Sequence, residues 1–290
     1  MAVSVKRFMG ARPAQRPGAY RRVWPAPLVG WLLLLGLAVI AVTPSTFAAY
    51  DPTRIVARPL SRPSLEHPLG TNDIGQDLLS ELIWGTRVSL TTGLAVAVAA
   101  VAVGTGVGII SGYFGGWGGS FLMRLVDLVL VLPFLPLVIL LGSYLGPSQR
   151  NVVLVLILVS WAGPARMVRA QVLTMLPQPY MEAARALGSS DFDIMVRHIW
   201  PGVRLIVLAQ LILVASLSIL AEASLSFLGL GDLSAKSWGT MLYFARASGA
   251  FLGSSWQWWV LPAGLMIAIS LLSLVLISLG LEGRVRGEGR

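Results

Sequence analysis

The stretch EAARALGSSDFDIMVRHIWP, residues 182–201, carries five charged residues and one histidine in a chain that is otherwise dominated by apolar runs. Apolar segments flank it on both sides, at about 151–172 and 205–228. Each of these segments is long enough to cross a bilayer as a helix, since about 20 residues span the hydrocarbon core. The stretch therefore predicts a polar connection between two membrane helices, lying on one side of the membrane.

The composition of the whole chain agrees with this interpretation. The chain has 290 residues, of which 56% are hydrophobic and 12% charged, and its mean hydropathy is +0.76. These values indicate an integral membrane protein rather than a soluble domain. The net charge of +9 comes from basic residues between apolar runs, which favours a role in membrane orientation over nucleic-acid binding.

Several kinds of chemistry are disfavoured by the residues that the chain contains. It has no cysteine, and its two histidines, His67 and His198, are too far apart in sequence to form a local metal motif, so we expect no metal site. Its two lysines, Lys6 and Lys236, follow Val5 and Ala235, so neither completes the Gly-Lys-Ser/Thr of a P-loop. We therefore expect no ATPase or other enzymatic activity, and no bound cofactor, in this chain.

Six segments have the length and apolarity of a transmembrane helix. The first apolar run is 28–47, within a first helix placed at 28–49, and its length argues against a cleaved signal peptide. The second lies between Arg87 and Arg124 and ends near Gly112. The remaining four are 122–144, broken by Pro133 and Pro136, then 151–172, 205–228 and 260–281. The expected fold is thus an all-α membrane protein with six spans, five of them in a core at 87–281.

The distribution of basic residues predicts which ends face the cytosol. Six lie in the N-terminal tail, five between residues 166 and 204, three at the C-terminus, and Arg124 adds one more. These fifteen oppose seven on the other face (Arg54, Arg58, Arg62, Arg87, Arg150, Lys236 and Arg246). The positive-inside rule then predicts a cytoplasmic tail at 1–27, an extracytoplasmic segment at 50–86, a cytoplasmic loop at 177–202 and a cytoplasmic tail at 282–290.

The polar loop itself has the pattern of two short amphipathic helices joined by a glycine. Tyr180, Ala183, Ala184 and Leu187 follow the i, i+3, i+4, i+7 spacing, and Gly188 is suited to a left-handed helix end. Ser190 and Asp193 fit a capping box for a second helix. The apolar stripe of that second helix repeats the spacing before Pro201, at Phe192, Met195, Val196 and Ile199. Helices this short need cover from the bundle, the membrane surface or another protein, and spacing alone leaves the three open.

The same loop resembles the EAA loop of permease subunits in binding-protein-dependent ABC importers. The matching positions are Glu182, Ala183, Ala184, Gly188 and Pro201. The resemblance implies a type I importer transmembrane domain whose loop forms coupling helices. Those helices dock on a cytoplasmic ATPase subunit, with Phe192 and Met195 contributing to the contact.

Two further segments resemble the C-type permease subunit of dipeptide and oligopeptide importers. They are HPLGTNDIGQDLLSELIWGTRVSL at 67–90, and ILAEASLSFLGLG at 219–231 followed by SWG at 237–239. The signature residues of the first are His67, Pro68, Leu69, Gly70, Thr71, Gly75, Asp77, Gly85, Arg87 and Ser89. Departures are Asn72, Gln76 and Trp200, the SAK at 234–236 before SWG, and the short C-terminal tail. The resemblance covers roughly residues 65–281.

The resemblance implies a set of partners in the bacterial cytoplasmic membrane. They are a homologous second permease, two ATP-binding subunits that hold ATP and magnesium, and an extracytoplasmic substrate-binding protein. The implied cargo is short peptides, with nickel chelates, glutathione or a similar small solute as the alternative. An ATP-independent secondary transporter would need paired intramembrane ionisable groups, and the sequence offers one clear interior carboxylate, Glu222.

Three features inside the membrane segments have expected structural or pathway roles. Glu222 is expected either to line the pathway or to bond a nearby serine at a subunit seam. Arg124 and Asp127 have the spacing of a helical ion pair. Small residues recur every fourth position at Ala100, Gly104, Gly108 and Gly112, which predicts a flat face for close helix packing.

Overall fold

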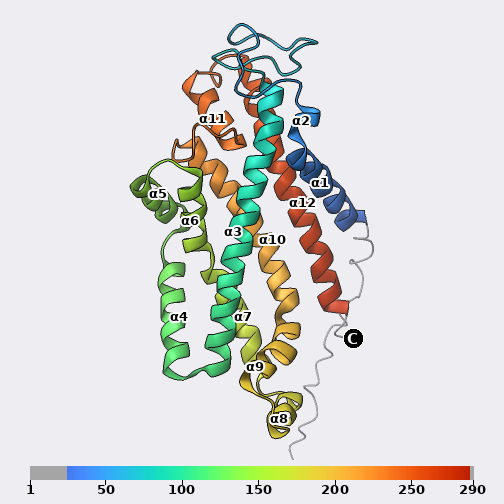
Figure 1. Cartoon of the computed structure of the whole chain (residues 1–290), viewed down its shortest axis with the longest axis vertical. Coiled ribbons are helices and arrows are strands. Elements are labelled where there is room, and N and C mark those ends of the chain that lie inside the picture. Colours follow the sequence, from blue (N-terminus) through green and yellow to red (C-terminus); the bar gives the residue numbers. More distant parts are fainter. Residues whose placement is uncertain (1–24, 288–290) are drawn as a thin grey trace, which may run out of the picture.

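The computed structural model describes residues 25–287, and their side chains from 26 to 281, as a bundle of helices (Figure 1). Within this part of the chain, the extended segments pair only as two isolated antiparallel bridges, Ile55–Gln76 and Thr71–Asp77. The longer helices are α1 (Pro25–Val42), α3 (Leu78–Phe114), α4 (Gly116–Val131), α5 (Phe134–Leu145), α6 (Gln149–Ser160), α7 (Ala162–Met175), α10 (Trp200–Phe227), α11 (Trp238–Ala247) and α12 (Val260–Gly287). The short ones are α2 (Pro44–Phe47), α8 (Pro179–Ala186), α9 (Asp191–Ile194), a π turn (Met195–Ile199) and a 3-10 turn (Ser255–Gln257).

Four helical segments among the described residues are long and apolar enough to cross a membrane. They are Leu78–Phe114, Gln149–Met175, Asp191–Phe227 and Ser255–Leu281. The bent pair α4 and α5 makes a fifth if it counts as one span, while the apolar helix at Ala26–Val42 is shorter. The all-helical membrane fold is therefore as expected, and the number of six spans stays a prediction.

The expected break in the third span is a sharp bend. The axes of α4 and α5 meet at 91°, with Leu132 and Pro133 in extended conformations between them. Proline disfavours helical geometry in the residue before it, so Leu132 ends α4. Pro136 lies in the first turn of α5, where the missing N–H costs no hydrogen bond.

Helix boundaries differ from the sequence prediction at several ends, and at the start of α3 a side-chain cap is the cause. Helix α3 begins at Leu78 because Asp77 caps it, with Oδ2 accepting the Ser80 N–H at 2.8 Å. Arg87, the expected start of the span, is exposed on the third turn of that helix. At the chain ends, α1 stops at Val42 rather than 49, and α12 continues to Gly287, through most of the segment expected to be a tail. Residues 1–24 and 288–290 of the expected tails lie outside the described part.

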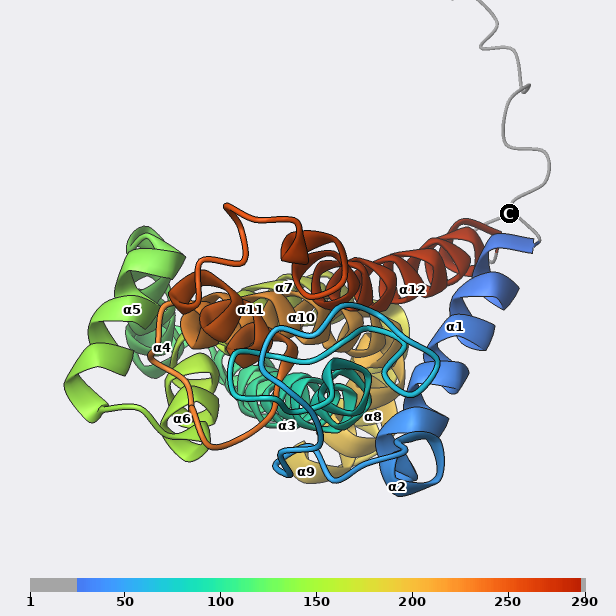
Figure 2. The ribbon, with the colours of Figure 1, turned by 90° about the horizontal axis from the view of Figure 1, so that it is seen from above.

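Helix α3 occupies the middle of the bundle beside α10, with α4 to α6 on one side and α1 and α12 on the other (Figure 2). Its small residues face α7 directly. A Cβ added at Gly104 would lie 2.4 Å from the Trp161 carbonyl oxygen, and one at Gly108 would lie 2.7 Å from that of Ala165. At Gly112 the added atom would meet Val172 Cβ at 2.9 Å. The four-residue repeat thus lies in a seam where α3 and α7 approach backbone to backbone.

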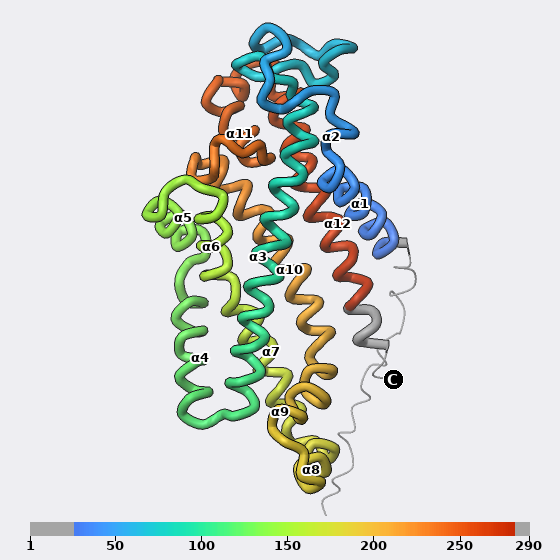
Figure 3. The backbone as a smooth tube through the Cα atoms, viewed as in Figure 1, coloured from blue at the N-terminus to red at the C-terminus, as the bar shows by residue number. Residues whose placement is uncertain are grey.

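The tube view shows two ends of the bundle that carry the sequence motifs (Figure 3). We call one the signature end, which comprises residues 50–77, the first turns of α3 and α11. We call the other the elbow end, which comprises α8, α9 and residues 187–190 between them. The two ends lie at opposite extremes of the long axis. The motifs at 67–90 and 182–201 are therefore not in contact, and the long helices of the bundle connect them.

The second short helix of the polar loop is continuous with α10, contrary to the expectation of two independent short helices. Residues 191–227 form one helical segment that passes through the π turn at Met195–Ile199. Pro201 has no N–H to donate to the turn before it. The helix continues because the hydrogen bonds of the preceding residues shift from the i−4 to the i−5 carbonyl, as in the bond from Trp200 N–H to the Met195 carbonyl. The π turn immediately before Pro201 provides that shift.

The glycine seam yields a prediction with a control on the same helix. Gly104→Val should lower the free energy of unfolding by about 1–3 kcal/mol, because the valine side chain would overlap the Trp161 carbonyl oxygen and Pro164. Gly106→Val is the control, since no atom lies within 4 Å of a Cβ added there. Thermal unfolding of both variants in detergent measures the difference. An equal loss of stability in the two variants would contradict close packing of α3 on α7 at Gly104.

Candidate functional site

The elbow is built from two complementary helix ends. At the end of α8, the Ser189 N–H bonds the Ala184 carbonyl at 3.1 Å and the Gly188 N–H bonds the Arg185 carbonyl at 3.0 Å. This is a Schellman motif, and Gly188 holds the left-handed conformation it needs, with φ of +81°. On the other side, Ser190 Oγ accepts the Asp193 N–H at 3.1 Å and caps α9. The expected glycine elbow therefore has a defined geometry.

Helix α8 attaches to the bundle by a different face from the one predicted by spacing. Met181 is buried in a cluster formed by α7, α9, the π turn and the start of α10 (Val168, Val172, Met175, Ile194, Ile199 and Val203), and Ala184 is also buried. Tyr180, Ala183 and Leu187, which were expected to share the stripe of Ala184, are exposed. Sequence reasoning missed Met181 as an anchor, although its i, i+3 spacing to Ala184 marks the true inner face.

The stripe after the elbow is also divided between inside and outside. Ile199 of the predicted stripe is buried within the bundle, together with Ile194, which was not part of that stripe. These two are five residues apart, and the π turn between them places an i+5 pair on one face. Phe192 and Val196 point outward and Met195 is half-buried, while Pro201 is exposed.

The outward face of the elbow combines apolar tips with charges. Leu187 is 87% exposed and Phe192 is 71% exposed. Glu182 and Arg185 are also exposed, and Arg197 forms an i, i+4 pair with Asp193 at 3.2 Å. This surface has the mixed character of a docking site, because apolar side chains this exposed gain free energy when a partner covers them.

At the signature end, His67 and Asp77 form a buried pair that closes the loop onto α3. The distance from His67 Nδ1 to Asp77 Oδ1 is 2.9 Å, while Asp77 Oδ2 accepts bonds from Ser80 N–H and Oγ. Both side chains are buried. These two signature residues therefore organise the start of a helix and are not presented to a ligand.

The glycines and the threonine of the signature allow close backbone contacts in the same loop. Gly70 and Gly75 have φ of +72° and +87°, and a Cβ there would lie 2.3 and 2.2 Å from the carbonyl oxygens of Ser61 and Ala57. Thr71 Oγ1 donates to the Arg58 carbonyl at 2.6 Å. Of the other signature residues in this loop, Leu69 is half-buried against the main apolar core and Pro68 is exposed.

The matched sequence segments meet around one buried carboxylate, Glu222. Its two carboxylate oxygens accept bonds from Ser89 Oγ at 3.1 Å and Ser226 Oγ at 2.8 Å. Trp238 of the SWG segment donates its backbone N–H to Ser89 Oγ at 3.3 Å and its indole N–H to the Leu82 carbonyl. Gly85 leaves room for that indole, with an added Cβ 3.2 Å from Trp238 Cδ1.

Glu222 is enclosed within the chain, with an exposed fraction of 0%. Its expected role in the pathway or at a subunit seam stays a prediction. The expected bond to a nearby serine is made, by Ser226, while Ser224 Oγ bonds the Leu220 carbonyl instead. Buried polar groups in a membrane protein need such partners within the chain.

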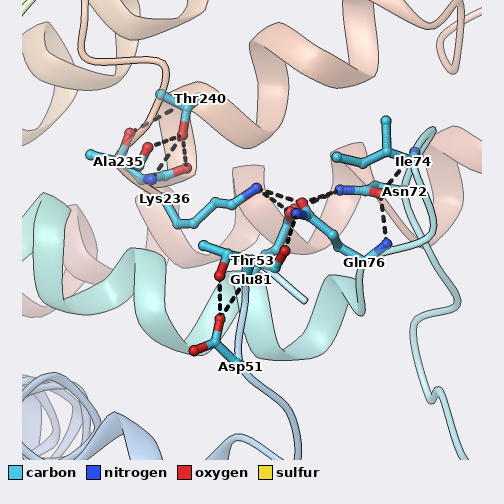
Figure 4. A network of polar contacts seen from close by, with 10 residues as sticks. Asp51, Thr53, Asn72, Ile74, Gln76, Glu81, Ala235, Lys236 and Thr240 are labelled. Carbon is cyan, nitrogen blue, oxygen red and sulfur yellow. Dashed lines mark hydrogen bonds and ion pairs between the residues drawn. The ribbon is translucent and has the colours of Figure 1, made fainter. Parts of the chain in front are cut away.

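A polar network centred on Lys236 joins three segments of the signature end (Figure 4). Lys236 Nζ lies 2.6 Å from Glu81 Oε1 and 2.7 Å from Gln76 Oε1. Asn72 Nδ2 donates to the same two oxygens, at 2.9 and 3.0 Å. Gln76 Nε2 reaches the Thr53 carbonyl at 2.8 Å. Sequence reasoning missed this site, although Asn72, Gln76 and the SAK segment are departures from the family pattern.

Beside this network, Asp51 and Thr53 form a small turn of their own. The Thr53 hydroxyl and backbone N–H both donate to Asp51 Oδ1, and these bonds lower the pKa of the exposed Asp51 carboxyl from its ordinary value. The carboxylate is therefore charged at neutral pH, at the outer surface of the signature end.

A second ion pair replaces the one expected within a single helix. Asp127 pairs with Arg166 of α7, and not with Arg124 three residues before it. The pair therefore links α4 to α7, because the approach of two helices brings a better-placed cation than the next turn does. Within residues 25–287, no group of three His, Asp or Glu side chains is arranged to hold a metal ion.

Comparison with known proteins identifies the family of the chain. Residues 104–287 match the profile of a family described as binding-protein-dependent transport system inner membrane component. The chain belongs to this family. That membership confirms the resemblance to permease subunits of ABC importers and the assignment as a multi-pass protein of the cytoplasmic membrane.

Individual relatives extend the match beyond the family profile. The dipeptide transport system permease protein of Alkalihalophilus pseudofirmus is 32% identical over 261 residues, 88% of this chain and 83% of that protein. The oligopeptide transport system permease protein of Mycobacterium bovis is 36% identical over 245 residues, 82% of this chain and 81% of its own length. The glutathione transport system permease protein of Pectobacterium atrosepticum is 36% identical over 186 residues, 64% of this chain and 62% of that protein.

The Lys236 network yields a second prediction. Lys236→Met should lower the free energy of unfolding by about 3 kcal/mol, because it leaves the Glu81 carboxylate buried without a cation. The side chains of Lys236 and Glu81 are only 14% and 3% exposed, so water screens the pair weakly. Chemical unfolding in detergent measures the loss.

Two further variants test the cause of that loss. Adding Glu81→Gln to Lys236→Met should recover part of the stability, since a neutral amide costs less to bury than a carboxylate. Arg150→Met removes an exposed cation from the start of α6 and should change stability little. A double variant no more stable than Lys236→Met would show that the buried charge is not the cause.

Proposed function

We propose that this chain is the permease subunit of an ATP-driven importer of short peptides, and that it forms half of the translocation pathway. The observation that carries the proposal is the match to dipeptide and oligopeptide permeases over 88% and 82% of the chain, which includes both the signature end and the elbow. Cargo selection would rest largely on the extracytoplasmic binding protein. The relative named for glutathione transport makes a small peptide-like solute the second candidate.

The elbow is the proposed contact with a cytoplasmic ATPase subunit. Its exposed Leu187 and Phe192, beside Glu182 and Arg185, provide the apolar tips and charged rim of a docking surface. The inner face of α8 is anchored by Met181, which shares one apolar cluster with residues of α7, α9, the π turn and α10. Force applied to α8 would therefore move the ends of two membrane helices together, which is how nucleotide-driven closure would change the bundle.

The remaining partners follow from what the chain supplies and what it lacks. Neither Lys6 nor Lys236 has a P-loop context, so ATP and magnesium would be bound by two partner ATPase subunits. A homologous second permease would supply the other half of the pathway. An extracytoplasmic binding protein would deliver the peptide to the signature end.

We further propose six spans with both termini in the cytosol. This topology counts α1 as one span and the bent pair of α4 and α5 as another. Helix α12 runs from the signature end toward the elbow end, which supports a cytoplasmic C-terminus on the same side as the elbow (Figure 1). The fifteen basic residues assigned to that side, against seven opposite, support the same orientation.

An ATP-independent secondary transporter is a weaker candidate on the same observations. Such a protein needs ionisable groups that exchange protons or ions with the pathway. Glu222 is enclosed between Ser89 and Ser226 and has no exposed surface. This arrangement favours a structural carboxylate over a coupling-ion site.

The absence of cysteine from the chain allows a direct test of side and partner. Leu187→Cys at the elbow should react with a membrane-impermeant maleimide only after permeabilisation, whereas Leu65→Cys should react in intact cells. A bifunctional crosslinker should join the Leu187→Cys variant, and not the Leu65→Cys variant, to a co-expressed ATPase subunit. Both native side chains are highly exposed, so a difference in labelling or crosslinking between the two variants reports the side of the membrane and not burial of the cysteine. Labelling of Leu187→Cys from outside the cell, or no capture during active uptake, would refute the proposal.

The backbone of the elbow gives a second functional prediction. Gly188→Pro should reduce uptake per ATP hydrolysed by at least about tenfold while the protein remains inserted, because proline cannot adopt a φ of +81°. Gly188→Asn is the control, since asparagine tolerates the left-handed region and a Cβ there meets no atom within 4 Å. Undiminished peptide uptake and ATPase activity in the proline variant, reconstituted with its partners, would contradict the proposed transmission of movement through the elbow.

A further inference from the structure

Tyr113, in the last turn of α3, contacts both sides of the elbow. Its hydroxyl donates to Asp191 Oδ1 at 2.6 Å, and Asp191 is the first residue of α9, after the elbow. Its ring lies 5.9 Å from the guanidinium carbon of Arg185, which belongs to α8, before the elbow. A single side chain from a central membrane helix therefore bridges the two arms that meet at Gly188.

The other hydrogen bonds of the elbow are local. The Schellman bonds and the Ser190 cap join residues within 184–193, and a Cβ at Gly188 would meet open space. The apolar cluster under α8 includes Ile109 and Tyr113 of α3 only as partly buried members. Tyr113 thus supplies the polar link from α3 to the elbow.

Helix α3 is suited to carry a displacement from this point. It is a 37-residue helix that is seated closely on α7 by Gly104, Gly108 and Gly112. At its far end, Asp77 caps the first turn and Glu81 bonds Lys236 of the signature end. A shift of its last turn is therefore passed along a rigid element to the opposite end of the bundle.

We propose that Tyr113 is a strut that couples the angle of the elbow to the position of α3. The inference rests on the proposed function, in which an ATPase subunit moves α8. A change of angle at Gly188 moves Arg185 and Asp191 relative to each other, so Tyr113 cannot keep both contacts. The two elbow states then differ in their contacts with α3, which is the condition for coupling two sites.

Tyr113→Phe tests the strut because it removes the hydroxyl and keeps the ring. In the complete transporter reconstituted in vesicles, we expect uptake per ATP hydrolysed to fall about three- to tenfold, the effect of losing one charge-assisted hydrogen bond. Asp191→Asn should give a fall of similar size, and the double variant should fall no further. Insertion and thermal stability, measured for each variant, should stay at the wild-type level.

Two matched controls separate the strut from general effects. Tyr144→Phe removes the hydroxyl of an exposed tyrosine at the end of α5 and should leave uptake per ATP hydrolysed unchanged. Asp193→Asn removes a charge from the same first turn as Asp191, but its partners are Ser190 and Arg197. Asp193→Asn should therefore reduce uptake per ATP hydrolysed less than Asp191→Asn does.

The outcomes distinguish the strut from the proposed function itself. Crosslinking of the Leu187→Cys variant to the ATPase subunit, carried out in the Tyr113→Phe background, reports docking independently of the strut. A wild-type uptake ratio in Tyr113→Phe with intact crosslinking would overturn the strut and leave the proposed function standing. Additive losses in the double variant would also overturn it. Absence of crosslinking in a chain that carries Leu187→Cys alone would instead refute docking at the elbow.

Discussion

The close approach of α3 to α7 is the contact on which the arrangement of the bundle depends. Three glycines at four-residue intervals leave room for carbonyl oxygens and side chains of the facing segment, so the two backbones lie in direct contact. In a membrane, where apolar side chains gain nothing by leaving lipid, such packing is a main source of helix association. Because α3 is fixed in this way, its two ends become reference points for the loops that pack on them.

Each end of α3 then receives a different type of interaction. At the signature end, His67, Asp77 and the Lys236 network bury charges and satisfy them within the chain. At the elbow end, Tyr113 and the apolar cluster under α8 leave the outer face of the loop exposed. The buried charges of the signature end are thus paired with one another, while at the elbow end Leu187 and Phe192 are not covered by the described residues.

The sequence predicted the features that depend on local chemistry. Apolar runs indicated the membrane helices, the prolines indicated the break near residue 133, and Gly188 with Ser190 indicated the elbow. Features that depend on tertiary contacts were missed. Ala184 and Leu187 lie on the same predicted stripe, yet Ala184 is buried and Leu187 is exposed. The spacing could not separate them, because the difference depends on which parts of the fold pack against each position. Likewise, Asp127 had a sequence neighbour in Arg124, yet the approach of α7 supplied Arg166 instead.

The π turn before Pro201 has a mechanical consequence. It holds about one more residue per turn than an α-helix, and it separates the elbow from the body of α10. If this turn relaxed to α geometry, everything before it would rotate by about 100° about the helix axis, since each α-helical residue contributes that angle. The segment before the π turn would thus rotate relative to the segment after it by a one-residue slip, with both segments remaining helical.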